Sequence, residues 1–409
     1  MLLLLIQVLT GGSTEHILLD WRNQMFRVAI GHSIDPDSES AISEAISECK
    51  KVLDGEVPQA GILFTAIDFD HGLILQQIQN AFGEIELIGG TTNGEISSSM
   101  GFQQDSLTLM VFASDEVEIR AGLGREVSKN PNLIAQQAVE MAKVKSSAKT
   151  QLCLTFPESL TSNGVLILEG LKQSLGENIP IIGGMTADDY LFSQTYQFFQ
   201  NEVVSDAVPV LLFSGNLQFS YGVASGWTPI GKRSCVTKVD GNVLYEIDGQ
   251  PALDFYQHYL GAEKFAANYA IHALAVFEDD NSFYMRAPNG YDTDSRSVTF
   301  FSDIPKDAMV QITDASRENI LQASETSLQQ ALTNFPGTNP TAALLISCAA
   351  RRRILGTLTS KEFNLINNHL PQTLPCCGFY AYGEIAPLTT EGQTNFHNKT
   401  FVTLLMGTN

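Results

Sequence analysis

The C-terminal stretch from Thr341 to Met406 is the part of the sequence that decides the fold. It opens with the apolar run Ala342-Ala-Leu-Leu-Ile-Ser-Cys348, which is followed by a basic loop, Ala349-Ala-Arg-Arg-Arg353. A helix-like segment over 361–370 leads into the turn-rich block Cys376-Cys-Gly-Phe-Tyr-Ala-Tyr-Gly-Glu-Ile385, and an apolar strand closes the stretch. This order predicts a strand, a helix and two further strands, with a glycine-containing turn before the last strand.

Two earlier parts of the chain have the same order of elements. The first copy has a strand, a helix, a strand with a glycine loop and a closing strand at residues 61–66, 72–82, 85–96 and 105–113. The second copy has these elements at residues 152–156, 165–175, 179–189 and 206–215. Gly383-Glu384-Ile385 matches Gly94-Glu95-Ile96 of the first copy, whereas the second copy carries Asp188-Asp189 at that point. We therefore expect three related units.

The fold class follows from these units, because a strand, a crossover helix and a parallel strand form a right-handed unit. The sequence predicts an α/β protein with mixed sheets covered by helices, built from repeated β-α-β-β units in two closely packed halves. We place the halves at residues 25–225 and 226–409. No low-complexity linker separates them, so we expect them to pack together. Ser316 is expected to cap a long helix, and Thr359-Ser-Lys-Glu362 to form a capping box.

Composition restricts the classes of partner. The 409-residue chain has 24 Lys and Arg against 45 Asp and Glu, a net charge of −21. This acidity argues against nucleic acid and against an anionic membrane surface as partners. The six cysteines form no C-x-x-C pair, so reduced thiols in a cytoplasmic protein are expected. The apolar start is too short to span a bilayer, and we expect residues 1–24 to be a leader outside the fold, with a signal peptide as the alternative.

The residues described so far resemble the FIST family (F-box and intracellular signal transduction). The half at 25–225 resembles its FIST N domain through Ile88-Gly-Gly-Thr-Thr-Asn-Gly-Glu95 and Gly183-Gly-Met-Thr186. The half at 226–409 resembles its FIST C domain through Ser347-Cys348, Arg351, Gly378-Phe-Tyr-Ala-Tyr-Gly-Glu-Ile385 and Phe396-His-Asn398. The resemblance runs from about Met25 to the end of the chain.

The resemblance implies a sensory domain that binds a small ligand and acts through a separate signalling protein, such as a histidine kinase or a diguanylate cyclase. One branch of the family binds haem and senses nitric oxide, so haem b is a possible cofactor and a gas sensor is an alternative function. We expect no enzyme activity. A further alternative is an enzyme with Cys348 as nucleophile and His397 as base, although no nucleophile-elbow, phosphate-loop or zinc motif supports it.

Candidate ligand-binding residues follow the predicted strands, since ligands in such sheets sit beyond the carboxyl ends of the strands. In the first two copies they are Gly89, Gly90, Thr91, Thr92, Glu95, Gly184 and Thr186. The glycines could cradle a ligand or could serve tight turns alone. Glu95 and its counterpart Glu384 could hold a ligand amine or brace their loops with backbone hydrogen bonds.

The third copy supplies the remaining candidates. Arg351 could pair with a ligand carboxylate or lie solvated in its loop. Tyr380 and Tyr382 would share one face of a strand and could line a pocket or pack in the core. Cys348 could be a reactive thiolate or a small buried hydrophobe.

Histidines are considered because a haem would need an axial ligand. His397, which precedes Asn398 and the last strand, could bind haem iron or hydrogen-bond a loop. His258, on a helix rich in aromatic residues, and His272, inside an apolar run, are the rival candidates. No metal site is expected apart from such a haem, and Cys-x-x-Cys-His, the signature of covalent haem attachment, is absent from the sequence.

Overall fold

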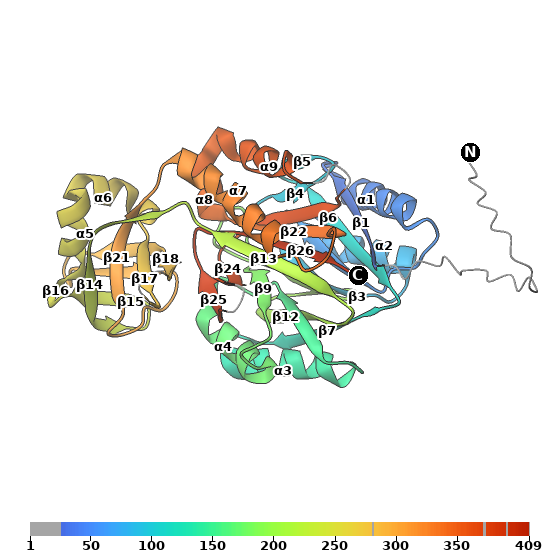
Figure 1. Ribbon diagram of the computed structural model, residues 1–409, viewed down its shortest axis with the longest axis horizontal. Helices are drawn as coiled ribbons and strands as arrows, with labels where there is room; N and C mark the ends of the chain where they lie inside the picture. The colour runs from blue at the N-terminus through green and yellow to red at the C-terminus, as the bar shows by residue number, and fades with distance from the viewer. Residues whose placement is uncertain (1–25, 280–281, 371–373, 390–391, 409) are drawn as a thin grey trace, which may run out of the picture.

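Three six-stranded sheets form the core of the protein, and a fourth, eight-stranded sheet forms a smaller lobe beside it. The computed structural model describes residues 26–279, 282–370, 374–389 and 392–408. Figure 1 shows the lobe at the left and the core at the right. The leader expected at 1–24 lies outside the described residues. The division expected after residue 225 stays a prediction.

The first sheet contains the first repeat. Its order is β1 (Phe26–Ser33), β6 (Leu107–Ser114), β2 (Ala60–Thr65), β3 (Glu86–Thr91), β10 (Gln197–Phe199) and β11 (Glu202–Val204). The central strands β2 and β3 are parallel, as the sequence pattern predicts, and β6 is antiparallel to β2. Helices α1 (Ser38–Leu53) and α2 (His71–Phe82) pack against this sheet. Their apolar side chains and those of the sheet form one buried cluster.

The second sheet repeats this arrangement. Its order is β7 (Val117–Arg125), β12 (Ala207–Gly215), β8 (Thr150–Thr155), β9 (Ile181–Gly184), β24 (Glu384–Pro387) and β25 (Thr394–His397). Helices α3 (Pro131–Val144) and α4 (Gly164–Leu175) cover it. Each begins after an asparagine, Asn130 or Asn163, whose side chain accepts a hydrogen bond from the first turn.

The third sheet has the same order again. It runs β13 (Gln218–Ala224), β26 (Phe401–Gly407), β22 (Ala342–Cys348), β23 (Cys376–Ala381), β4 (Glu95–Ser97) and β5 (Gly101–Gln103). Its helices are α7 (Arg317–Asn334), α8 (Ala349–Leu355) and α9 (Thr359–Asn367), with a short 3-10 turn, Gly356–Leu358, between the last two. The prediction of three related units is therefore confirmed.

Several local expectations change. Ser316 caps α7 as predicted. The prediction of a basic loop at 349–353 is wrong, since these residues begin helix α8. The predicted capping box is also wrong. The residue before the first turn of α9 is Leu358, which has no polar side chain to cap it, and the Glu362 carboxylate bonds to Arg351.

Each repeat contributes a hairpin to the sheet of another repeat. The hairpin β4–β5 follows the first repeat but pairs with β23, β10–β11 follows the second but pairs with β3, and β24–β25 follows the third but pairs with β9. Each crossing is closed by an equivalent backbone bond, from Tyr380, Thr91 or Met185 to the residue before the hairpin strand. The three sheets are thus joined in a ring.

The inner faces of the three sheets meet in one apolar cluster. At its centre Phe64, Phe156 and Phe379 contact one another, one from each repeat, with ring centroids 4.2 to 5.6 Å apart. Gly184 packs against this centre, where a Cβ would lie 2.8 Å from Ala381 and Ile346. The interior is therefore filled, and any ligand site must lie at the ends or edges of the sheets.

The lobe is inserted between β13 and α7 of the third repeat. Its strands are β14 (Thr228–Asp240), β15 (Val243–Ile247), β16 (Gln250–Pro251), β17 (Leu274–Phe277), β18 (Phe283–Arg286), β19 (Pro288–Asp292), β20 (Ser297–Phe300) and β21 (Met309–Asp314). Helices α5 (Ala252–Leu260) and α6 (Ala262–Asn268) and a 3-10 turn, Tyr269–Ile271, complete it. We use "the lobe" for residues 228–314 and "the core" for the three six-stranded sheets and their helices.

Candidate functional site

A cavity of about 1070 Å3 lies between the core and the lobe, and we call it the inter-lobe cavity. One wall is the loop Ser159–Gly164, which follows the central strand of the second repeat. A second wall comes from the lobe and includes Asn242, Asn289 and Phe301. The third wall is the end of β22 and the start of α8, from Cys348 onward. The cavity therefore lies beyond the carboxyl ends of strands from two repeats.

Close packing behind the cavity is possible because small residues stand there. A Cβ on Gly164 would lie 2.6 Å from the Phe396 ring, and one on Gly383 would lie 2.4 Å from the same ring. Both glycines let Phe396 fill the corner between α4 and β25. The Phe396 ring is also part of the cavity lining.

A buried polar group lies behind Cys348. Glu384 accepts hydrogen bonds from the backbone N–H and hydroxyl of Thr400 at 3.0 and 2.9 Å through Oε2. Its Oε1 has no hydrogen-bond partner among the described residues. Burial raises the pKa of Glu384 to about 8, although the Thr400 hydrogen bonds act in the opposite direction. Burial likewise raises the pKa of the Cys348 thiol, so this cysteine is a thiol at neutral pH, which weighs against its role as an activated nucleophile.

Lys399 is a buried cation close enough to Glu384 to feel its charge. Its Nζ donates to the Ile271 carbonyl at 3.1 Å and lies 4.9 Å from the centre of the Trp227 ring. Burial lowers the pKa of Lys399 to about 8, while the nearby Cys348 and Glu384 raise it. Ile271 belongs to the lobe and lines the cavity, so the Lys399 hydrogen bond joins the core to the lobe at the cavity wall.

The repeats show how unusual this group is. Lys399 stands just before the closing strand of the third repeat, β26, as Asp105 and Asp206 stand before β6 and β12 in the other repeats. All three residues have a positive φ of 52° to 64°. Glu384 has Glu95 as its counterpart in the first repeat. In the second repeat the counterpart is Gln197 rather than the expected Asp188-Asp189, because Gln197 occupies the same register beside the neighbouring sheet. The cation is thus a feature of the third repeat alone.

An aromatic cluster stands at the cavity mouth, on the loop after β9. Asp188 accepts three backbone N–H bonds from this loop, from Phe192, Ser193 and Gln194, at 2.7 to 3.0 Å. The Tyr382 hydroxyl donates to Asp188 at 2.6 Å. Phe192, which has a φ of 48°, stacks on the Tyr382 ring at a centroid distance of 4.9 Å. Left-handed backbone at a phenylalanine is strained, so these bonds hold the ring in place.

Of the fourteen predicted ligand residues, three line the inter-lobe cavity: Cys348, Tyr382 and Asn398. Glu384 and His397 are buried behind this wall. The others lie elsewhere, in two closed polar clusters and in the places where sheets cross.

Arg351 and Tyr380 belong to the first closed cluster, which is centred on Glu362. The Arg351 guanidinium contacts Glu362 Oε1 at 2.7 Å and also bonds to Ser225, Ile320 and Ser324. The Tyr380 hydroxyl donates to Glu362 Oε2 at 2.7 Å. Arg351 and Glu362 are both fully buried, so this arginine is used by the protein's own carboxylate.

Glu95 and Thr92 belong to the second closed cluster. Glu95 accepts hydrogen bonds from the hydroxyls of Thr92 and Ser106, and no cation pairs with it among the described residues. Burial raises its pKa to about 7. The carboxylate bonds to hydroxyl groups of its own loop, whereas bracing by backbone hydrogen bonds was expected.

The remaining candidates lie where sheets cross. A Cβ on Gly89 would lie 1.9 Å from the Leu63 carbonyl oxygen, and one on Gly90 2.3 Å from Thr186. Thr91 accepts a hydrogen bond from the Tyr196 backbone. These residues allow close approach of chains, and none of them lines the inter-lobe cavity.

The three histidines do not fit a haem in this cavity, because none of them lines it. His258 is exposed on α5. His272 is buried beside Thr313 and Asp314. His397 contacts the Ala386 carbonyl oxygen at 2.8 Å through Nε2, and burial lowers its pKa to about 4. The gas-sensor alternative stays a prediction.

Sequence reasoning missed most of the cavity wall. Phe192, Phe301 and the hydroxyl-rich loop 159–164 carry no motif, and the lobe had no role assigned to it. The run of small polar residues Ser159 to Gly164 directly after a predicted strand was the one available signal. Like the glycine loops of the first repeat, this run follows a predicted strand and is therefore a candidate ligand-binding loop.

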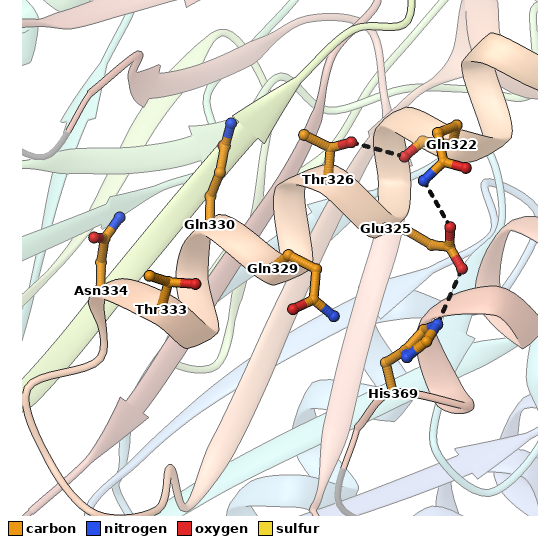
Figure 2. Close-up of a pocket in the computed structure, with 8 residues that line it drawn as sticks. All are labelled: Gln322, Glu325, Thr326, Gln329, Gln330, Thr333, Asn334 and His369. Carbon is orange, nitrogen blue, oxygen red and sulfur yellow. Dashed lines mark hydrogen bonds and ion pairs between the residues drawn. The ribbon is translucent and has the colours of Figure 1, made fainter.

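A second hollow lies on the outer face of α7, with a volume of about 500 Å3. Figure 2 shows its polar side chains along the helix, with His369 facing Glu325 and Gln322 bonded to the same carboxylate. The Glu325 carboxylate therefore already has two partners within the hollow. The hollow is an open groove lined by polar residues. It lacks the apolar wall with a few convergent polar groups that is typical of a small-molecule site.

The chain belongs to the FIST family. Residues 59–250 match its FIST N domain and residues 252–387 its FIST C domain, and these domains are associated with sensory roles in signal transduction. Among the described helices, none combines the length and the apolar character that a membrane crossing requires.

The curated relatives are uncharacterised proteins. One of Mycobacterium tuberculosis is 23% identical over 88% of this chain and 95% of its own length. One of Methanocaldococcus jannaschii is 30% identical over 42% of this chain, and this chain spans about a third (34%) of that relative's length.

Two solved structures align along most of the chain. Cyanuric acid hydrolase from A. caulinodans has a TM-score of 0.38 at 8% identity, covering 94% of this chain and all (100%) of that one. A chorismatase has a TM-score of 0.36 at 7% identity, covering 94% and 98%. Similarity at this level carries no argument about this protein.

Proposed function

We propose that the protein is a sensor that binds a small molecule in the inter-lobe cavity and passes the signal to a separate protein. The observation that carries the proposal is the origin of the cavity walls, which come from the second repeat, the third repeat and the lobe. A molecule bound there would contact all three. Its binding energy would therefore depend on how the lobe is held against the core.

The segment 395–399 supports a route from the cavity to the lobe. Its residues bond to four separate points of the lobe: Asn395 to Glu278 at 2.7 Å, the Phe396 carbonyl to Arg286 at 2.7 Å, Asn398 to the Ala287 backbone at 3.1 Å, and Lys399 to the Ile271 carbonyl at 3.1 Å. Phe396 and Asn398 line the cavity as well. A ligand that contacts these side chains would act on the bonds that hold the lobe.

Binding is tested by blocking the cavity. Ala350 lines it at the start of α8, so Ala350→Trp would fill part of its volume. Gln329→Trp, in the groove of Figure 2, is the matched control, since Gln329 is exposed on α7. The assay is thermal unfolding of the three proteins with a library of organic acids, amino acids, nucleosides and sugars.

We expect at least one compound to raise the Tm of the wild type and of the control saturably, and to leave Ala350→Trp unchanged. Stabilisation of about 2.7 kcal/mol is expected at a ligand concentration of about 100 Kd. A library in which every stabilising compound acts equally on Ala350→Trp would contradict the proposal.

Signalling is tested separately with a purified histidine kinase or diguanylate cyclase from the same source. The kinase or cyclase rate is measured with the protein, with and without the stabilising compound. The expected result is a rate that changes only when the protein and the compound are both present. A rate that is indifferent to the protein for every such enzyme tested would contradict the signalling part.

A further inference from the structure

The charge of the cavity wall is opposite in sign to that of the chain. The net charge of the whole sequence is −21. The charged residues that line the inter-lobe cavity are Arg317, Arg353 and Asp303, two positive and one negative. A wall with this balance in an acidic protein favours an anionic occupant.

Arg353 is the cation best placed for such an occupant. It is exposed, and no ion pair or hydrogen bond joins its side chain to another described residue. The two preceding arginines are both used within the protein, Arg351 by Glu362 and Arg352 by Asp189 at 2.8 Å. Arg317 also donates a hydrogen bond from Nε to the Ile354 carbonyl at 2.8 Å. The Arg353 guanidinium thus keeps its planar set of donors for a carboxylate.

Flat apolar surface lies at the mouth of the same cavity. Phe192 is 50% exposed and Phe301 is 47% exposed, although each is a large aromatic side chain. Their rings are nearly parallel, at 22°, with centroids 6.5 Å apart. A third ring stacked between two others needs about 3.5 Å on each side, roughly 7 Å in all. A small opening of the lobe would therefore admit a planar group between them.

Polar atoms on the loop wall complete the arrangement. The hydroxyl oxygens of Ser159 and Ser162 are buried and have no hydrogen-bond partner among the described residues. Both residues line the cavity. Buried hydroxyls normally find partners, so a ligand with its own polar substituent would satisfy them.

From these observations we infer that the inter-lobe cavity takes a small planar organic anion of the aromatic carboxylate class. The carboxylate pairs with Arg353, the ring lies against Phe192 and Phe301, and a polar substituent meets the serine hydroxyls. This inference rests on the proposed function, because it names the class of molecule that the same cavity would bind.

The test is isothermal titration calorimetry on the full chain with three probes. The first is 4-hydroxybenzoate, which has the charge, the ring and the hydroxyl. The second is 4-hydroxybenzamide, a neutral molecule of similar shape, and the third is cyclohexanecarboxylate, an anion without a flat ring. The variants are Arg353→Ala, Phe192→Leu, and Arg125→Ala as a control at an exposed arginine outside the cavity.

We expect 4-hydroxybenzoate to bind wild type and Arg125→Ala alike, and Arg353→Ala roughly tenfold or more weaker, as for loss of a charged hydrogen bond. Phe192→Leu should weaken binding by a few fold, as for loss of one ring contact. Equal affinity for the amide and the carboxylate, or for the flat and the puckered ring, overturns the inference, as does no binding of 4-hydroxybenzoate at millimolar concentration.

Failure of the class and failure of the proposed function give different results. If 4-hydroxybenzoate fails while a library compound stabilises wild type and not Ala350→Trp, the class is wrong and the sensor function stands. If no compound distinguishes Ala350→Trp from wild type, both are wrong.

Discussion

Arg351 and Arg353 lie two residues apart on α8 and differ in burial and in partners. Arg351 is fully buried and paired with Glu362, whereas Arg353 is exposed on the cavity wall and has no partner among the described residues. Residues two apart on a helix point to different sides, which accounts for the separation. Arg351, with its partners, contributes to the stability of the fold, whereas the Arg353 guanidinium is available to bind a ligand. Position in the fold decides which arginine has which role.

The largest effect that would sharpen this comparison is on stability. Arg351→Ala leaves Glu362 as a buried, uncompensated carboxylate, so we expect the free energy of unfolding to fall by about 3–5 kcal/mol. Arg353→Ala should stay within about 0.5 kcal/mol of wild type. Urea denaturation of the three proteins measures both values. Similar losses for the two variants would break the comparison.

A second, smaller effect is the pH dependence of stability that comes from Glu95 in the second closed cluster. The pKa of Glu95 is raised to about 7, so the folded protein binds more protons than the unfolded chain between the ordinary pKa of 4.5 and about 7. The stability contributed by the neutral carboxyl is complete below pH 4.5 and is lost as pH rises through 7. Glu95→Gln stays neutral, as Gln197 does at the equivalent place in the second repeat.

We therefore expect the unfolding free energy of Glu95→Gln, relative to wild type, to rise by up to about 3 kcal/mol between pH 5 and pH 8. Denaturation curves at several pH values across this range measure the difference. A difference that is constant with pH would show that the Glu95 carboxylate is ionised at no cost in this cluster.

The smallest expected effect concerns the cavity mouth. Tyr382→Phe removes the hydroxyl that donates to Asp188 and accepts from the Tyr190 backbone at 2.8 Å. A cost of about 1–2 kcal/mol is expected, since one partner is a carboxylate. Hydrogen exchange at the Phe192 and Ser193 amides should become faster, while exchange in β2 is unchanged. Unchanged exchange in the loop would mean that Asp188 alone holds it.

Much of the fold could be predicted from the sequence, because apolar periodicity and glycine-rich turns are local signals. The three repeats and the positions of their central strands follow from such signals. The exchange of hairpins could not be predicted, since the pairing of β4 with β23 depends on residues far apart in the chain. The capping box also failed, because the residue before α9 is Leu358, and Glu362 bonds to Arg351 of the preceding helix.

The site was predictable only in part. Cys348, Tyr382 and Asn398 line the cavity, and all three come from the block that carries the family resemblance. The sequence alone cannot tell which arginine of Arg351-Arg-Arg353 is buried against Glu362 and which faces the cavity, because the three residues are identical. The aromatic residues of the mouth come from two remote segments, and only the folded chain brings Phe192 beside Phe301.

The exchanged hairpins have a consequence for how the chain is made. The segment that includes β4 is synthesised early, yet its partner strand follows much later: Ser98 bonds to Cys376, 278 residues further on. Until the ribosome has delivered β23, this hairpin has no neighbour, and the sheet of the first repeat waits likewise for β10. Unpaired strand edges invite association between nascent chains. Fragments cut between the two family domains would keep such edges permanently, so the chain is expected to be expressed whole or not at all.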